Sequence, residues 1–190
     1  MRVKRLGRLR LRPELNNLRS ALIIVVPEAA YAVDEWLERT CAAKPSSGVP
    51  AHVTLLFPFV PAREIDDGLV ERLGLLFARF DGFAFDLRET ERFPATLYLA
   101  PEPKEPFVRL TKALMVEYPH LPPYGGAFDS IVPHVTVAEG DSELLNEAER
   151  DVREALPIGA EREVILLEEV EPHLARWEVR ARLPFGERSA

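Results

Sequence analysis

Two short stretches of this sequence repeat one pattern, Pro50-Ala51-His52-Val53-Thr54-Leu55-Leu56 and Ile131-Val132-Pro133-His134-Val135-Thr136-Val137. Each holds a proline and then His-Val-Thr among apolar and β-branched residues, a composition typical of strands. Side chains of a strand alternate between its two faces, so each stretch shows an imidazole and a hydroxyl on one face and buries apolar side chains on the other. If the two strands face each other, two imidazoles meet across one cleft.

A pair of facing imidazoles suits phosphoryl transfer. In an in-line displacement the attacking and leaving oxygens lie on opposite sides of phosphorus, so His52 and His134 can act as base and acid. Thr54 and Thr136 can donate hydrogen bonds to the non-bridging oxygens and stabilise the charge that develops there. This chemistry requires no metal, and the pattern alone does not decide which histidine is the acid.

Outward from these strands, hydrophobic periodicity and turn residues predict the remaining elements. Together they form a mixed order of strands and helices in a chain of 190 residues that is 47% apolar. This order favours an α+β fold. The predicted strands are 21–26, 52–59, 83–87, 96–100, 131–138, 164–170 and 174–183, and the predicted helices are 28–40, 64–80, 106–117 and 142–156.

Charge divides the chain into a basic tail at 1–19, a single domain at 20–185 and a short tail at 186–190. The tail is basic although the whole chain has a net charge of −7, so the domain itself is acidic. An acidic domain disfavours binding along long duplex nucleic acid, which needs a broad basic surface. The sequence leaves open whether the tail is disordered, is an interaction arm or results from an upstream start codon.

Other sequence features bear on location and assembly. The apolar run Ala21 to Val26 is too short for a signal peptide core, and no stretch is long enough to span a membrane. The single cysteine, Cys41, permits no internal disulfide, which suits a reducing cytoplasm. Nothing in the sequence places a base beside Cys41. We expect a cytoplasmic protein without a membrane partner, and we favour a monomer.

With both motifs in view, the sequence resembles the two-histidine (2H) phosphoesterase superfamily, and within it the 2′-5′ RNA ligase and cyclic phosphodiesterase-like proteins. The likeness covers about Ser20 to Phe185 and includes Ala-Leu-Ile-Ile-Val-Val-Pro-Glu at 21–28 as well as both His-Val-Thr motifs. It implies two pseudo-symmetric lobes, each with an antiparallel sheet flanked by helices, around a central groove that displays both motifs.

The same resemblance implies an activity without metal or cofactor. The implied reaction opens 2′,3′-cyclic phosphates of RNA ends or small nucleotides to 2′-phosphates, with ATP-independent 2′-5′ ligation as a related reaction. It makes His52 the general acid and His134 the base, although these roles are exchangeable. It also implies that Thr54 and Thr136 bind the phosphate. Two alternatives stay open, which are a catalytically idle RNA- or nucleotide-binding module of the same fold and a regulatory partner protein that acts through residues 1–19.

Several other residues invite a functional interpretation. A base could stack on Phe93, Tyr98 or Tyr124, although core packing or loop anchoring is favoured for each. Phosphate could bind to Arg92 or Lys104, although solvated surface charge is favoured for both. His120 and His173 lie beside prolines and lack the threonine, so we expect them at the surface. The acidic run at Glu168 and Glu169 is typical of a solvated strand edge.

Overall fold

The computed structural model describes residues 18–127, 130–161, 164–171 and 175–186, so most of the basic tail and His173 lie outside the described residues. The strands are β1 (Ser20–Val25), β2 (His52–Leu56), β3 (Ala84–Phe93), β4 (Thr96–Glu102), β5 (Val135–Glu139), β6 (Ile158–Glu161), β7 (Val164–Glu171) and β8 (Arg176–Leu183). The α-helices are α1 (Ala30–Thr40), α2 (Asp67–Phe77), α3 (Glu105–Glu117) and α4 (Ser142–Arg153). None of the described helices has the length and apolar content to cross a membrane.

All eight strands form one sheet in the order β6-β3-β4-β5-β2-β1-β7-β8, with antiparallel neighbours throughout. The sheet consists of two four-stranded halves that meet at its centre, where β2 and β5 share one pair, Val53 with Val135. Each half contains one His-Val-Thr strand, preceded by a strand and a helix: β1-α1-β2 in one half and β4-α3-β5 in the other. The α+β fold of two pseudo-symmetric lobes is therefore confirmed.

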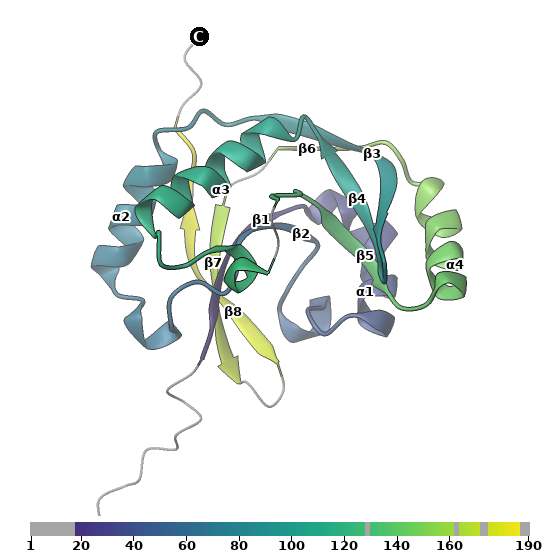
Figure 1. Cartoon of the computed structure of the whole chain (residues 1–190), viewed down its shortest axis with the longest axis horizontal. Coiled ribbons are helices and arrows are strands. Elements are labelled where there is room, and N and C mark those ends of the chain that lie inside the picture. The colour runs from purple at the N-terminus through teal and green to yellow at the C-terminus, as the bar shows by residue number, and fades with distance from the viewer. Residues whose placement is uncertain (1–17, 128–129, 162–163, 172–174, 187–190) are drawn as a thin grey trace, which may run out of the picture.

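Two helices pack on the half of the sheet to which their own preceding strand does not belong. Helix α1 follows β1 but packs against β5, and α3 follows β4 but packs against β2. Figure 1 shows the result: α1 and α4 lie beside β4 and β5, whereas α2 and α3 lie on the side of β1, β7 and β8. Each lobe therefore depends on a helix from the other half of the sequence, which ties the two halves together.

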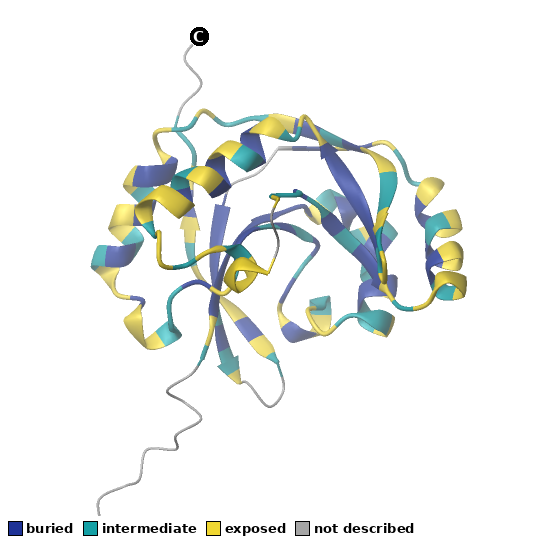
Figure 2. Cartoon of the chain, viewed as in Figure 1, coloured by how far each residue is buried: buried dark blue, intermediate teal, exposed yellow. Residues whose placement is uncertain are grey.

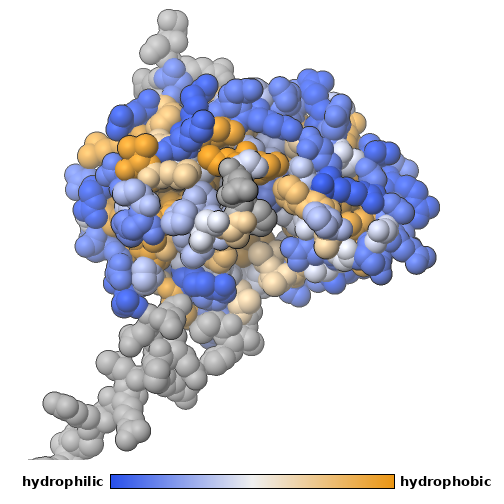
Figure 3. Space-filling view, viewed as in Figure 1, coloured by the Kyte–Doolittle hydropathy of each residue, from blue (hydrophilic) through white to orange (hydrophobic). Residues whose placement is uncertain are grey.

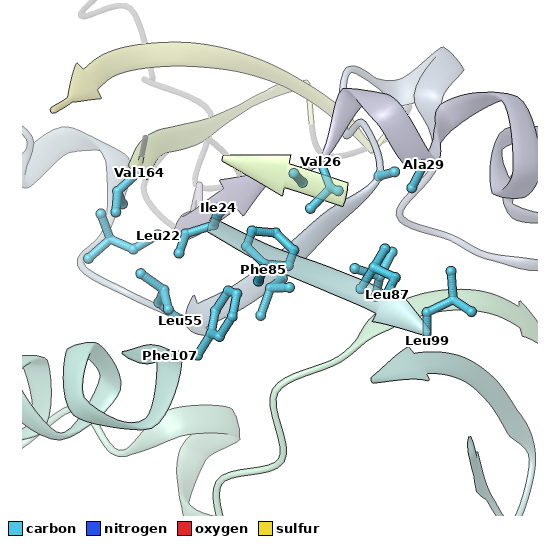
Figure 4. Packing of buried hydrophobic residues seen from close by; sticks show 14 of the residues in the cluster. Leu22, Ile24, Val26, Ala29, Leu55, Phe85, Leu87, Leu99, Phe107 and Val164 are labelled. Atoms are coloured by element: carbon cyan, nitrogen blue, oxygen red, sulfur yellow. The ribbon is translucent and has the colours of Figure 1, made fainter. Parts of the chain in front are cut away.

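The main hydrophobic core lies between the sheet and these helices. Leu22 and Ile24 of β1, Phe85 and Leu87 of β3, and Phe107 of α3 are essentially removed from solvent and belong to one cluster (Figure 4). The strands are mostly dark blue in Figure 2, and the outward faces of the helices are yellow. Phe107 also makes edge-to-face ring contacts with Phe83 and Phe85 at centroid distances of 5.1 and 4.9 Å.

A second, smaller cluster lies on the opposite face of β1 and β7. It contains Ile23, Val49, Leu167 and Trp177, with Phe57 packed against it. No helix of the other half is needed to form it, and part of it borders a cavity described below.

Several predicted boundaries differ from the structure, and one strand was not predicted. The predicted strand 131–138 begins only at Val135, because Pro133 has no N–H for a ladder. Strand β3 continues through the charged stretch up to Phe93, beyond the predicted end at Leu87, because its backbone pairs with β4 and its side chains Thr90 and Arg92 bond to α4. The short strand β6, which contains Gly159, was not predicted; it pairs with the edge of β3.

Replacing Phe107 with alanine tests the main core. The side chain is fully buried, so Phe107→Ala loses its burial and leaves a cavity, and we expect it to lower the free energy of unfolding by about 3–5 kcal/mol. Val116, on the same helix, is 80% exposed, and Val116→Ala should change it by about 0.5 kcal/mol or less. Urea denaturation measures both, and equal losses would contradict this description of the core.

Candidate active site

The central pair of strands brings the two His-Val-Thr motifs together. Val53 and Val135 are antiparallel partners, and both are buried with their side chains away from the motif face. Residues that flank an antiparallel pair lie crosswise, so His52 lies beside Thr136 and Thr54 lies beside His134. All four of these side chains are half-buried, as expected for one face that borders a groove. The two histidines and two threonines thus form one polar cluster across the junction of the lobes.

Both imidazoles are held in the same way by their own backbone. His52 Nδ1 lies 2.8 Å from the carbonyl oxygen of Pro50, and His134 Nδ1 lies 2.7 Å from that of Val132. A carbonyl oxygen can only accept, so Nδ1 carries the proton and donates it in both rings. Nε2 of the neutral imidazole is then the atom left to accept or transfer a proton. The structure therefore gives both histidines the tautomer that acid-base chemistry at Nε2 requires.

Burial shifts both imidazoles toward the neutral form. It lowers the pKa of His52 below the ordinary value of 6.5, and a positive charge on nearby His134 lowers it further, against the effect of the Pro50 carbonyl. Burial also lowers the pKa of His134, while the Val132 carbonyl partly opposes it. Burial therefore favours the neutral form of both imidazoles in the free protein at neutral pH.

Thr54 links His52 to a tyrosine on another segment. Its Oγ1 lies 3.2 Å from His52 Nε2, to which the hydroxyl donates when the ring is neutral. The hydroxyl of Tyr124 is hydrogen-bonded to the same threonine. Tyr124 lies in a proline- and glycine-rich turn with φ of 52°, a left-handed conformation that is uncommon outside glycine, and its backbone N–H donates to the Phe57 carbonyl. The turn therefore holds this phenol beside the cluster.

Two cavities meet at Thr54 and Tyr124. We call the first the His52 cavity; it measures about 310 Å³ and is bordered by polar groups of His52, Thr54, Thr136, Tyr124 and Glu139, and otherwise by apolar and cysteine side chains. The second, the Phe93 cavity, measures about 780 Å³ and extends from Thr54 over Phe93 to α3. Figure 3 shows hydrophobic residues near α3 on this face, within a largely hydrophilic surface.

Phe93 and Tyr98 pack against His134. Their rings stack on each other at 4.4 Å between centroids, and each ring lies 5.3 Å from the imidazole. The Tyr98 hydroxyl donates to Glu91, which also accepts from Lys104, and burial together with this carboxylate raises the pKa of Tyr98 to about 12. Tyr98 is 4% exposed, so it has no open face on which a base could stack. Core packing is the observed role.

Two arginines have structural partners rather than a place at the cluster. Arg92 of β3 forms an ion pair with Glu149 of α4, so it does not face the threonines. Arg19, at the end of the basic tail, donates to both carboxylate oxygens of Glu169 and lies 5.5 and 5.7 Å from the ring centroids of Phe57 and Trp177. Glu169 is 2% exposed, so its assignment to a solvated strand edge was wrong.

Sequence reasoning missed Tyr124 as a partner of Thr54 and missed Glu139 altogether. Glu139 lies beyond the predicted strand end and, three residues after Thr136, would face away from it in a regular strand. His120 is exposed, as expected. Within the ranges that the structure describes, no three His, Cys, Asp or Glu side chains cluster in a way that could hold a metal ion.

This fold and its paired histidine strands are those of the two-histidine phosphoesterase superfamily. The sequence model of the 2′-5′ RNA ligase superfamily matches residues 25–174, and the chain belongs to that superfamily. No curated protein matches the sequence significantly.

Solved structures agree on the fold. The chain is similar to E. coli LigT complexed with NADP+, with 18% identity, a TM-score of 0.55 and coverage of 90% of this chain and 99% of that one. It is also similar to TT0787 of Thermus thermophilus, with 24% identity, a TM-score of 0.56 and coverage of 90% and 100%. The near-complete coverage of both solved chains shows that the two lobes form one shared architecture.

The state of the imidazoles is open to direct measurement. In ¹⁵N NMR spectra at about pH 8, His52 and His134 should both show the tautomer protonated on Nδ1. Their titration midpoints should fall below 6.5, because burial favours the neutral ring. A midpoint above 6.5, or protonation on Nε2, for either residue would contradict the hydrogen bonds described here.

Proposed function

We propose that this protein is a metal-independent phosphodiesterase that opens 2′,3′-cyclic phosphates of small nucleotides or RNA ends to 2′-phosphates. The observation that carries the proposal is the matched pair of imidazoles, each with Nδ1–H bonded to a backbone carbonyl two residues earlier, which leaves Nε2 as the atom for proton transfer. Nε2 of His52 also lies 3.2 Å from Thr54 Oγ1. Two such groups on one face supply the acid and the base that an in-line displacement needs.

The reaction balances with these two groups alone. One neutral imidazole accepts a proton at Nε2 from water, whose oxygen forms a new bond to phosphorus. The bond between phosphorus and the 3′ oxygen breaks, and the other imidazole, protonated beforehand, gives its proton to that oxygen. The product is a 2′-phosphomonoester with a free 3′ hydroxyl. We assign the acid to His52 and the base to His134, and the reverse assignment uses the same geometry.

The threonines hold the phosphoryl group during this step. Thr54 and Thr136 lie crosswise from the two histidines and border the His52 cavity, so their hydroxyls can donate to the non-bridging oxygens. A phosphoryl group that binds there takes the Thr54 hydroxyl away from His52 Nε2. Substrate binding thereby frees Nε2 for proton transfer.

A nucleotide substrate suits the two cavities. LigT structures from E. coli have been solved with 3′-AMP, ATP and NADP+, so those proteins accommodate nucleotides on the same fold. In this chain each cavity starts at Thr54, next to the proposed phosphoryl position. With a 5′ hydroxyl in place of water as the nucleophile, the same step would join a 2′,3′-cyclic end to that hydroxyl through a 2′-5′ linkage and release the 3′ hydroxyl, which is the ATP-independent 2′-5′ ligation. We place the reaction in a reducing cytoplasm, with a monomer as the working unit.

A binding module without turnover is the alternative. It would keep the groove, the threonines and the cavities but would not use Nε2 of either histidine. Loss of turnover without loss of binding in the histidine variants separates the two hypotheses.

The paired histidines give the first test of activity. We expect wild-type protein to convert a 2′,3′-cyclic nucleotide to the 2′-phosphate in EDTA, and His52→Ala or His134→Ala to lower kcat by about 10²–10⁴-fold. The matched control is His120→Ala, at an exposed turn, which should keep wild-type kcat. Binding of the 2′-phosphate product to a wild-type protein that lacks turnover would favour the binding module instead.

The threonine hydroxyls give an independent test. Thr136→Val keeps the shape and removes the donor, and we expect a loss in kcat/KM of about ten- to a hundredfold, the value of a hydrogen bond to a charged oxygen. Thr136→Ser restores the hydroxyl and should recover most of the activity. Equal kinetics of the valine and serine variants would exclude a role for this hydroxyl in phosphate binding.

A further inference from the structure

The His52 cavity contains a carboxylate that the proposed reaction does not use. Glu139 is exposed at the cavity mouth and is the one charged side chain among the described residues that line it; none of those residues is Lys or Arg. Its backbone is fixed, since its N–H donates to Thr40 Oγ1 at 3.2 Å and it pairs with Thr96 across the sheet. The side chain thus projects from an anchored position.

A β-bulge places this side chain on the face of the sheet that carries Thr136. Along β4 and β5, Tyr98 pairs with Thr136 but Leu97 pairs with Ala138, so Val137 is an extra residue in β5. One extra residue inverts the alternation that follows it, which returns Glu139 to the face that carries His134 and Thr136. Thr136 and Glu139 accordingly border the same cavity. Bulges that redirect one side chain are frequent next to active sites.

The other walls of the cavity suit a flat, uncharged group. Ile23, Val49, Leu167 and Trp177 form its apolar side, with Phe57 at 6.1 Å from Trp177 between ring centroids. Arg19 lies over these two rings, and its charge is already matched by Glu169. At about 310 Å³ the cavity is at the small end of the range for small-molecule sites, about 300–1,000 Å³.

We propose that the His52 cavity binds the nucleobase of the substrate and that Glu139 selects bases that donate N–H groups to it. This inference rests on the proposed function, because it assigns the base of the same phosphodiester. A carboxylate accepts hydrogen bonds only, so it favours amino groups such as that of cytosine. Guanine fits best, since its ring N–H and amino group can donate to both carboxylate oxygens. Uracil fits least, because its single N–H is flanked by two carbonyl oxygens that the carboxylate repels.

The test compares guanosine and uridine 2′,3′-cyclic phosphates as substrates of wild type and Glu139→Gln. We expect wild type to show a higher kcat/KM for guanosine and the variant to lower the guanosine-to-uridine ratio by about five- to tenfold. Glu143→Gln, an exposed glutamate at the start of α4, is the matched control and should keep the wild-type ratio.

Equilibrium binding of guanosine and uridine 2′-phosphates to the same proteins, by calorimetry, separates this inference from the proposed function. Turnover with an unchanged ratio in Glu139→Gln would overturn base selection and leave the phosphodiesterase in place. Guanosine-selective binding that Glu139→Gln abolishes, without turnover in wild type, would support base selection and overturn the catalytic proposal. Neither turnover nor binding would overturn both.

Discussion

The antiparallel pair between Val53 and Val135 is the contact on which the site depends. It is the one residue pair that joins β2 to β5, and it sets the crosswise arrangement of two histidines and two threonines. The pair alone is too small to hold two lobes in register, so the exchanged packing of α1 on β5 and α3 on β2 must do most of that work. A mutation in either helix would therefore change the geometry of the groove, although neither helix carries a proposed catalytic side chain.

In each half of the site, a backbone carbonyl next to or within a proline residue holds the histidine ring. Pro50 stands two residues before His52 and supplies the carbonyl that accepts from Nδ1, whereas Val132 supplies it before His134 and Pro133 lies between them. In both cases the carbonyl of the residue two positions before the histidine accepts the ring N–H. The tautomer is thus set by local chain geometry rather than by a distant carboxylate, so it does not depend on the relative position of the lobes.

The sequence alone places His52, Thr54, His134 and Thr136 on one face, because strand alternation is local and the motif occurs twice. The structure brings these four residues together, and their catalytic role stays a proposal. Glu139 was missed because its face depends on a bulge, and the bulge arises from pairing with β4, which no local pattern reports. Glu169 was misjudged because its burial depends on Arg19, 150 positions away in the chain. The strand β6 was missed because four residues at a sheet edge carry little periodicity.

Binding of an anionic substrate depends on the charge of the groove. An anionic phosphodiester would normally be met by lysine or arginine, yet none lines the His52 cavity among the described residues, and Glu139 adds negative charge at its mouth. Lys112 lines the adjoining Phe93 cavity, and burial disfavours an imidazolium at either histidine in the free protein. A bound phosphoryl group supplies the missing counter-charge and raises the pKa of the nearest imidazole, so binding and protonation of the acid are coupled. In the proposed reaction, both rings would thus stay neutral in the empty site, and a bound substrate would favour the proton that its leaving oxygen needs.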